Sequence, residues 1–271
     1  LAEAMKLSQA EVFEVATFYH HFDVVKEGEE TPPKLTVRVC DGLPCEMAGA
    51  HNLLARLPAL LGREVRVIAA PCVGRCEAAP VAVVHQKPVV HATPDRLQAA
   101  VRADDRFDHV GGHIALADYV AKGGYALLRD CHADRRDAES VIAALEHAGL
   151  RGLGGAGFPA GRKWRIVRAQ SAPRLMAVNI DEGEPGTFKD RWLLERDPHR
   201  FLEGLLIAAW AVGIEAMYVY LRDEYHGCRA MLEGELAALR AAPPVPLPAI
   251  ELRRGAGAYI CGEETSLLES L

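Results

Sequence analysis

Four cysteines near the start of the chain have the type and spacing that could hold a metal centre. Cys40 and Cys45 form one short pair, and Cys72 and Cys76 form a second pair a short distance further on. Two thiolates on one loop can bind one side of a small metal centre, and a second loop can close the other side. C-x₄-C opens the plant-type [2Fe-2S] pattern, whereas structural zinc loops usually contain C-x₂-C. The pattern favours an iron–sulfur cluster over a zinc site or four thiols that only fill a core.

A glycine-rich segment, LRGLGGAGFPAGRKW, follows a predicted helix further along the chain. Gly152, Gly154 and Gly157 spell G-x-G-x-x-G, but a dinucleotide fingerprint should follow a strand, so the match is weak by itself. So many glycines are unfavourable inside a helix or strand, because each loses backbone entropy on folding. They suit a loop on which a ligand lies against bare backbone, and a flexible loop is the alternative.

Two acidic segments follow predicted strands and resemble each other in design. The strand at 174–180 leads into Asp181, Glu182 and Glu184, and the segment IELRRGAGAYICGEETSL carries an acidic pair before a helix that begins near Thr265. Acids grouped in this way are often a solvated turn. Together with the glycine loop, they supply the backbone amides and carboxylates that a nucleotide or flavin site needs.

The two cysteine pairs belong to a small α/β unit. A capping box at Ser8 and Glu11 predicts an N-terminal helix, and a charged, proline-containing link follows it. The pattern then predicts a strand ending at Cys40, a helix, a strand ending at Cys72, a hairpin with its turn at 86–88, and a last helix. This is a thioredoxin-like order, and both cysteine pairs lie just past strand ends, where ligands of open α/β sheets gather.

The second half of the chain predicts a Rossmann-like parallel sheet. The order β-α-β-α-β implies right-handed crossovers, so all three strand ends should open onto the same edge. The glycine loop and the acids should therefore converge. We expect an N-terminal helical segment at 1–33, the thioredoxin-like [2Fe-2S] domain at 34–105, a linker with a helix at 106–148, and a ligand-binding domain at 149–271.

Composition limits the class of protein. Half of the 271 residues are hydrophobic, a quarter are charged, and the formal net charge of −6 gives no electrostatic reason to bind nucleic acid. Seven cysteines are too few and too unevenly spaced for a secreted disulfide scaffold. No apolar run is long enough to span a membrane. We expect a cytoplasmic protein with no direct membrane insertion. Both ends of the chain interrupt helical patterns, so part of the functional unit is expected beyond them.

The motifs together resemble a known group of redox subunits. The segments RGLGGAGFPAGRKW, AVNIDEGEPGTFKDR and GAGAYICGEETSLLESL are similar to the flavin-binding, NADH-oxidising subunit of respiratory complex I and its relatives in NAD-reducing hydrogenases and NAD-dependent formate dehydrogenases. The first 105 residues, with EVATFYHHF and the four cysteines, resemble the thioredoxin-like [2Fe-2S] subunit of the same assemblies. The resemblance implies that FMN, NAD(H) and a [2Fe-2S] cluster are the cofactors, with a [4Fe-4S] cluster only beyond Leu271.

The resemblance also implies roles for individual residues. The cluster ligands would be Cys40, Cys45, Cys72 and Cys76. The FMN would contact Gly152, Gly154, Gly155, Lys163, Asn179, Asp181, Glu182, Tyr259, Gly262 and Glu263. The NAD(H) would contact Phe158, which would stack on adenine, with Glu184 and Glu264 on the nicotinamide nucleotide. No acid–base residue is needed for hydride transfer. Cys131, Cys228 and Cys261 are expected to be structural.

Fusion of the two modules, the short interval between the cysteine pairs, and Leu153 in RGLGG favour the β subunit of an NAD-dependent formate dehydrogenase. Its expected partners are a molybdenum or tungsten catalytic subunit and a further iron–sulfur subunit. The diaphorase of an NAD-reducing hydrogenase and the flavoprotein subunit of NADH:quinone oxidoreductase stay open as alternatives. A docking subunit without cofactors is the alternative from another class.

Overall fold

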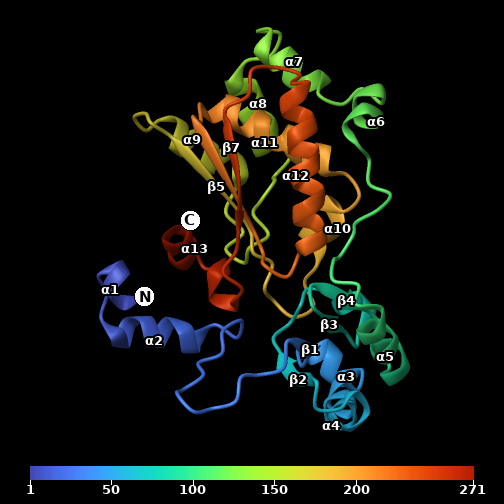
Figure 1. The fold of residues 1–271 in the computed structure, drawn as a ribbon. Coiled ribbons are helices and arrows are strands. Elements are labelled where there is room, and N and C mark those ends of the chain that lie inside the picture. Colours follow the sequence, from blue (N-terminus) through green and yellow to red (C-terminus); the bar gives the residue numbers. More distant parts are fainter.

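The computed structural model describes residues 1–271 as two α/β domains, beside which an N-terminal helical segment extends (Figure 1). The segment contains α1 (Ala2–Met5) and α2 (Gln9–Phe18). The predicted capping box is confirmed, because Ser8 Oγ accepts the amide of Glu11 and the Glu11 carboxylate accepts the amide of Ser8. None of the helices combines the length and the apolar character that crossing a membrane requires.

The first domain has the predicted thioredoxin-like order. Its four-stranded sheet has the order β2-β1-β3-β4, with β1 and β2 parallel and the other pairs antiparallel. The strands are β1 (Leu35–Cys40), β2 (Val65–Ala70), β3 (Ala82–Val84) and β4 (Lys87–Val89), and the helices are α3 (Leu43–Met47), α4 (Ala50–Leu61) and α5 (Pro94–Ala103). Val37 and Val39 of β1 pack against Leu53, Leu57 and Leu97, so the helices cover one face of the sheet.

The hairpin turn lies one residue earlier than the sequence predicts. Lys87 and Pro88, expected in the turn, belong to β4, and His85 takes the left-handed conformation with φ 56°. A proline is tolerated there because β4 is an edge strand, whose free side needs no amide hydrogen. The prediction of the hairpin is therefore confirmed, and only the position of its turn is wrong.

The second domain contains the predicted parallel sheet. Its order is β5-β6-β7, and Ile180, Leu221 and Arg254 are paired at the carboxyl edge. The elements are β5 (Leu175–Ile180), α10 (Lys189–Leu194), α11 (Pro198–Val212), β6 (Ala216–Leu221), α12 (His226–Ala241), β7 (Ala249–Arg254) and α13 (Glu264–Ser270). The loops that follow the three strands thus start from one edge.

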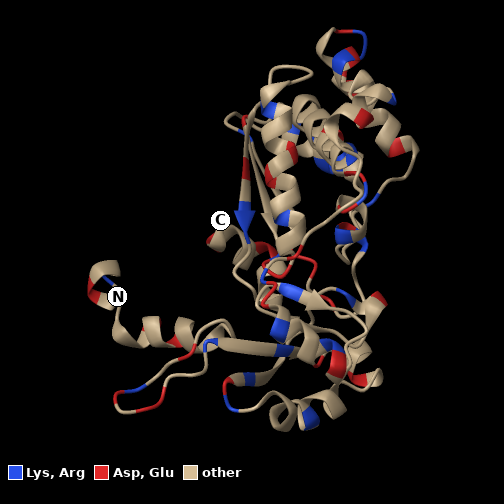
Figure 2. Ribbon diagram, turned by 45° about the vertical axis from the view of Figure 1, so that its right-hand side comes forward, with Lys and Arg blue, Asp and Glu red and all other residues tan.

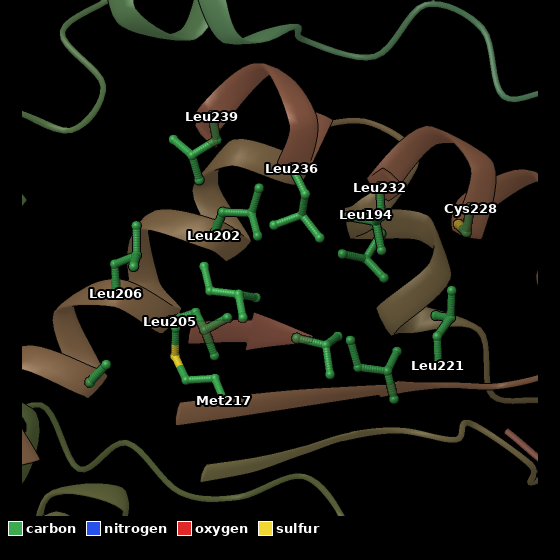
Figure 3. Packing of buried hydrophobic residues seen from close by; sticks show 14 of the residues in the cluster. Leu194, Leu202, Leu205, Leu206, Met217, Leu221, Cys228, Leu232, Leu236 and Leu239 are labelled. Carbon is green, nitrogen blue, oxygen red and sulfur yellow. The ribbon is translucent and has the colours of Figure 1, made fainter. Parts of the chain in front are cut away.

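Two helices bury the main core against one face of this sheet. Leucines of α11 and α12 meet side chains of β6 in the cluster that Figure 3 shows, including Leu202, Leu205, Met217, Leu221 and Leu236. Burial of a large aliphatic side chain contributes about 1.5–3 kcal/mol relative to leaving it exposed. This cluster therefore fixes β6, and with it the carboxyl edge where the charged loops begin.

The segment that lies between the two domains in the sequence is helical. A buried polar network links it to α11 and α12 of the second domain. Its helices are α6 (Leu116–Ala121), α7 (Ala126–His132) and α8 (Ala138–His147), and α9 (Ala160–Arg168) follows the glycine loop. His199 of α11 is fully buried, with Nδ1 2.8 Å from the Tyr125 hydroxyl and Nε2 2.6 Å from Glu235. The helix predicted before the glycine loop is confirmed as α8, which Asp137 caps.

Candidate cluster and flavin sites

The four predicted cluster cysteines lie together at the carboxyl ends of β1 and β2. Cys40 ends β1, Cys45 lies in α3, Cys72 follows β2, and Cys76 begins a short 3₁₀ helix. Cys40, Cys45 and Cys72 are buried, and the Sγ atoms of Cys72 and Cys76 are 3.4 Å apart. The fold of the first domain alone brings these thiols together, and none of them forms a disulfide.

The thiols are close enough to perturb one another. A hydrogen bond with Cys40 raises the pKa of Cys72, and a hydrogen bond from the same thiol lowers the pKa of Cys45. Burial raises the pKa of Cys76 to about 11. Four thiolates would repel each other in this space, so a cationic centre is needed to hold them deprotonated.

The donor set fits an iron–sulfur cluster, because all four donors are sulfur atoms and no imidazole or carboxylate lies among them. No group of three or more His, Cys, Asp and Glu side chains has the arrangement for a single metal ion. The assignment of Cys40, Cys45, Cys72 and Cys76 as ligands therefore stays a prediction that rests on donor chemistry and proximity.

The second cysteine loop docks onto the second domain. Arg191 of α10 donates from Nε to the Gly74 carbonyl at 3.0 Å and pairs with Glu77. Arg222, directly after β6, donates to the carbonyl oxygens of Cys72 and Glu182. Sequence reasoning assigned a role to neither arginine. The available signal for Arg222 is a cation directly after a buried strand, at the edge where the acids gather.

Close packing fixes the same junction. A Cβ atom on Gly74 would lie 2.5 Å from a ring carbon of Tyr225, so this position admits no side chain without displacement of the tyrosine. The Tyr225 hydroxyl in turn donates to the Glu182 carboxylate at 2.9 Å. The amide of Gly186 donates to Cys76 Sγ at 3.1 Å. The acidic loop that follows β5 therefore contacts the second cysteine loop directly.

Two of the three predicted flavin loops meet. Asn179 Nδ2 donates to the Gly262 carbonyl at 2.9 Å, and the Tyr259 hydroxyl lies 3.4 Å from Glu184 Oε1. A Cβ atom on Gly262 would lie 2.9 Å from the Asp181 carbonyl oxygen. The backbones after β5 and β7 thus approach as closely as glycine allows, and the tyrosine closes over them.

Asp181 has the most perturbed carboxylate of the predicted site. Its Oδ2 atom is buried without a hydrogen-bond partner, and burial raises its pKa to about 7. It lines a cavity of about 250 Å³ together with Gly183, Tyr259, Cys72 and Arg222. A buried carboxyl without a partner fits a hydrogen-bond donor that a ligand supplies. The cavity also places this carboxyl beside a predicted cluster ligand.

Two of the predicted acids already accept hydrogen bonds from backbone amides of the protein. The buried Glu182 carboxylate accepts the amides of Asp190 and Arg191 at 2.8 and 3.3 Å, which caps α10. Glu263 caps α13 by accepting the amides of Thr265 and Ser266. Their predicted flavin contacts stay predictions. In the structure, the two carboxylates cap the first turns of α10 and α13, the helices that follow these loops.

No hydrogen bond joins the first loop to the other two. Its hydrogen bonds are internal or go to the adjoining helix, as in Gly152 N to the Phe158 carbonyl at 3.0 Å. A Cβ atom on Gly154 or Gly155 would meet nothing within 4 Å, so the loop presents bare backbone to open space. Phe158 is 44% exposed. The expected convergence of three loops is therefore found for two of them.

Lys163, in the helix α9 that follows the first loop, shares a cavity with residues of the other two segments. It lines a mostly apolar cavity of about 640 Å³ in which Asn179 and Glu264 also take part. Glu264 is the exposed first residue of α13. This cavity, the open glycine backbone and the unpartnered Asp181 fit a flat aromatic ring with polar edges, as in a flavin. Lys163 and Asn179 would hold the group in this cavity, whereas Asp181 lines the smaller cavity and its flavin contact stays a prediction.

Two family models match the chain. Residues 145–271 match the family model described as the Nuo51 FMN-binding domain, and residues 1–104 match the thioredoxin-like [2Fe-2S] ferredoxin. The chain thus joins a thioredoxin-like [2Fe-2S] domain to a parallel-sheet FMN-binding domain, as the sequence predicts.

Individual relatives match part of the chain. The chain is 44% identical over 169 residues to an NADH-quinone oxidoreductase subunit of Rhizobium meliloti (strain 1021), a match that covers 59% of this chain and 40% of the relative. It is 43% identical over 144 residues to the mitochondrial NADH-ubiquinone oxidoreductase 51 kDa subunit of Neurospora crassa, a match that covers 48% of this chain and 29% of the relative.

A solved structure extends the similarity over both domains. An NAD⁺-reducing [NiFe]-hydrogenase in the H₂-reduced state contains a chain that superposes with a TM-score of 0.77 at 30% identity. The match covers 99% of this chain and 50% of the hydrogenase chain. The chain thus spans half or less of the length of these relatives.

Proposed function

We propose that this chain moves electrons between NAD(H), FMN and a [2Fe-2S] cluster, as a subunit of an NAD-dependent formate dehydrogenase. The observation that carries the electron-transfer proposal is the contact between the two sites. Gly186, two residues after the predicted nicotinamide residue Glu184, donates its amide to Cys76 Sγ at 3.1 Å. A cluster and a flavin held by these loops would be neighbours within one rigid junction.

The roles of the residues follow from their positions. FMN, when bound, supplies both hydride exchange with nicotinamide and single-electron exchange with an iron–sulfur centre. Asn179 holds the Gly262 carbonyl and so sets the distance between two loops, while Asp181 offers a buried carboxyl to the ring edge. Glu184 and Tyr259, which contact each other at 3.4 Å, would position the nicotinamide. Orientation is the main contribution of the protein.

The proposal that formate is the substrate of the partner subunit rests on fewer features of the chain. The chain contains all four cysteines and carries Leu153 in the exposed glycine loop, and in the resemblance these features favour formate dehydrogenase. The diaphorase of an NAD-reducing hydrogenase is the second candidate, and the hydrogenase chain that aligns with 99% of this chain favours it. NADH:quinone oxidoreductase is the third, supported by the NADH-quinone and NADH-ubiquinone oxidoreductase relatives.

The partner proposal follows from the same reasoning. A molybdenum or tungsten catalytic subunit, with a further iron–sulfur subunit, would exchange electrons with the cluster. The seven free cysteines support a reducing, cytoplasm-like compartment. Neither nucleic acid nor a membrane is part of the proposal.

The test uses the complex purified with its natural partners. Formate and hydrogen are supplied separately as electron donors and NADH formation is measured, together with molybdenum, tungsten and nickel content. Formate-dependent NADH formation with molybdenum or tungsten supports the proposal. Hydrogen-dependent formation with nickel would replace it by the diaphorase of a hydrogenase.

A second measurement tests the cofactor-free alternative. Addition of NADH should bleach the flavin absorbance of the wild-type complex, and Glu184→Ala should weaken this response by raising the NADH concentration that it requires. A colourless, folded preparation, or a Glu184→Ala protein that differs from the wild type only in stability, would favour a docking subunit.

A further inference from the structure

A large polar cavity lies where three parts of the chain meet, and none of its lining residues is among the predicted flavin residues. It has a volume of about 460 Å³. The end of the N-terminal segment contributes His21, the first domain contributes Arg38, and the second domain contributes His226. Acidic and basic residues are abundant at the level where the domains meet (Figure 2). The cavity therefore has polar walls drawn from all three parts.

Arg38 of the first domain lines this cavity. It lies in the middle of β1, where it pairs with Ile68 and Val83. Its neighbours Val37 and Val39 point into the core, so Arg38 points to the opposite face, which the helices of the first domain leave uncovered. Its Nε atom is buried without a hydrogen-bond partner. A buried N–H donor in this state needs an acceptor.

The neighbouring charges do not supply that acceptor. Arg66, the next cation along the sheet, is satisfied by both carboxylate oxygens of Asp23 at 2.7 and 2.8 Å. Of the acids that line the cavity, Asp223 is paired with Arg254 and lies 3.0 Å from His21. The other acid, Glu224, is paired with Arg222 at 2.9 Å. Both acids already have cationic partners. Arg38 is therefore left without an anionic partner.

One further nitrogen atom on a residue of the cavity wall is without a hydrogen bond. His226 Nδ1 is buried and has no partner. His21 also lines the cavity, but its Nε2 atom is paired with the Asp223 carboxylate at 3.0 Å. Two unsatisfied nitrogen atoms, one from each domain, thus belong to residues that line one space. A tetrahedral oxyanion presents oxygen atoms in several directions, and it can satisfy donors arranged in this way better than a planar carboxylate.

We propose that this interdomain cavity binds a phosphate group through Arg38 and His226. The phosphate is either inorganic or the phosphate of a nucleotide, because the cavity exceeds the size of the free ion and Phe107 and Val83 supply apolar wall beside the donors. A ligand held by both domains stabilises their docked arrangement. This site is separate from the residues predicted to bind FMN and NAD(H).

The experiment is calorimetric titration of the cofactor-loaded protein with inorganic phosphate and, separately, with 5′-AMP. Arg38→Met should weaken binding of the effective ligand by about tenfold or more, since it removes a charge-assisted hydrogen-bond donor. The matched control is Arg102→Met, which removes an exposed arginine of the same domain on α5. The control should leave the affinity unchanged.

Arg38→Lys serves if Arg38→Met does not fold, because it keeps the charge and loses the Nε donor. It should also bind more weakly than the wild type. A preference for 5′-AMP identifies the nucleotide as the source of the phosphate, and similar affinities identify the free ion. Absence of heat with both ligands, or equal affinity in the wild type and both Arg38 variants, would overturn the proposal.

Discussion

The cluster site and the flavin site differ in how far the fold completes them. The four cysteines belong to one small domain, and three of them are buried in its core with their neighbours in contact. The flavin residues come from loops that are far apart in the chain, and the glycine loop at 152–157 remains open. A site built into a hydrophobic core forms when the core forms. A site built from long loops needs a ligand to complete it where, as at the glycine loop, no protein hydrogen bond bridges the loops.

The largest expected effect concerns the cluster. Cys72→Ser should reduce iron and acid-labile sulfide by about tenfold or more, because a neutral hydroxyl replaces a thiolate in the ligand set. Iron and sulfide analysis of the purified protein checks this. Cys131→Ser is the control, since Cys131 is equally buried but lies in α7, in the other part of the molecule. Equal iron content in both variants would separate Cys72 from the cluster.

Glu182 and Glu184 test whether the acidic loop has separate structural and binding parts. Glu182→Gln should lower the free energy of unfolding by about 3 kcal/mol, because a buried carboxylate loses its charge-assisted hydrogen bonds to the start of α10. Glu184 is exposed, so Glu184→Gln should change stability little and weaken NADH binding instead. Urea unfolding and NADH titration give the two quantities. Equal loss of stability in both variants would contradict the division.

Two glycines test the contrast between the closed and open parts of the flavin site. Gly262→Ala should destabilise the protein by about 1–2 kcal/mol, because its Cβ atom would meet the Asp181 carbonyl oxygen at 2.9 Å. Gly154→Ala has open space around it and should leave stability within about 0.5 kcal/mol. Its effect should appear in FMN affinity, measured by fluorescence titration. Unchanged FMN affinity in Gly154→Ala would mean that the loop does not contact the flavin.

The pH dependence of stability tests the buried carboxyl of Asp181. Its pKa is raised to about 7 in the folded state, so the native protein binds more protons than the unfolded chain between about pH 4 and pH 7. The free energy of unfolding should therefore fall as pH rises through this range, and the fall should be smaller in Asp181→Asn. Urea unfolding at several pH values measures it. Identical slopes would show that another group causes the dependence.

Much of the architecture could be predicted from the sequence, because the signals were local. Alternating apolar residues predicted β1 and β2, and the capping residues Ser8 and Asp137 predicted helix starts that the structure confirms. The turn before Lys87 was misplaced, since a proline indicates a turn unless the strand lies at the edge of a sheet. Whether a strand lies at an edge depends on the whole sheet.

The residue types of the site could be predicted from the sequence, but the contacts between those residues could not. The sequence by itself determined the two domain types, the grouping of four cysteines, and the presence of glycine and acidic loops at strand ends, because these depend on short-range spacing. Only the tertiary structure decided that Arg222 bridges the Cys72 and Glu182 carbonyls, and that Arg38 is left without a partner. Such contacts join residues that are distant in the chain, and they form only when two separately packed cores dock.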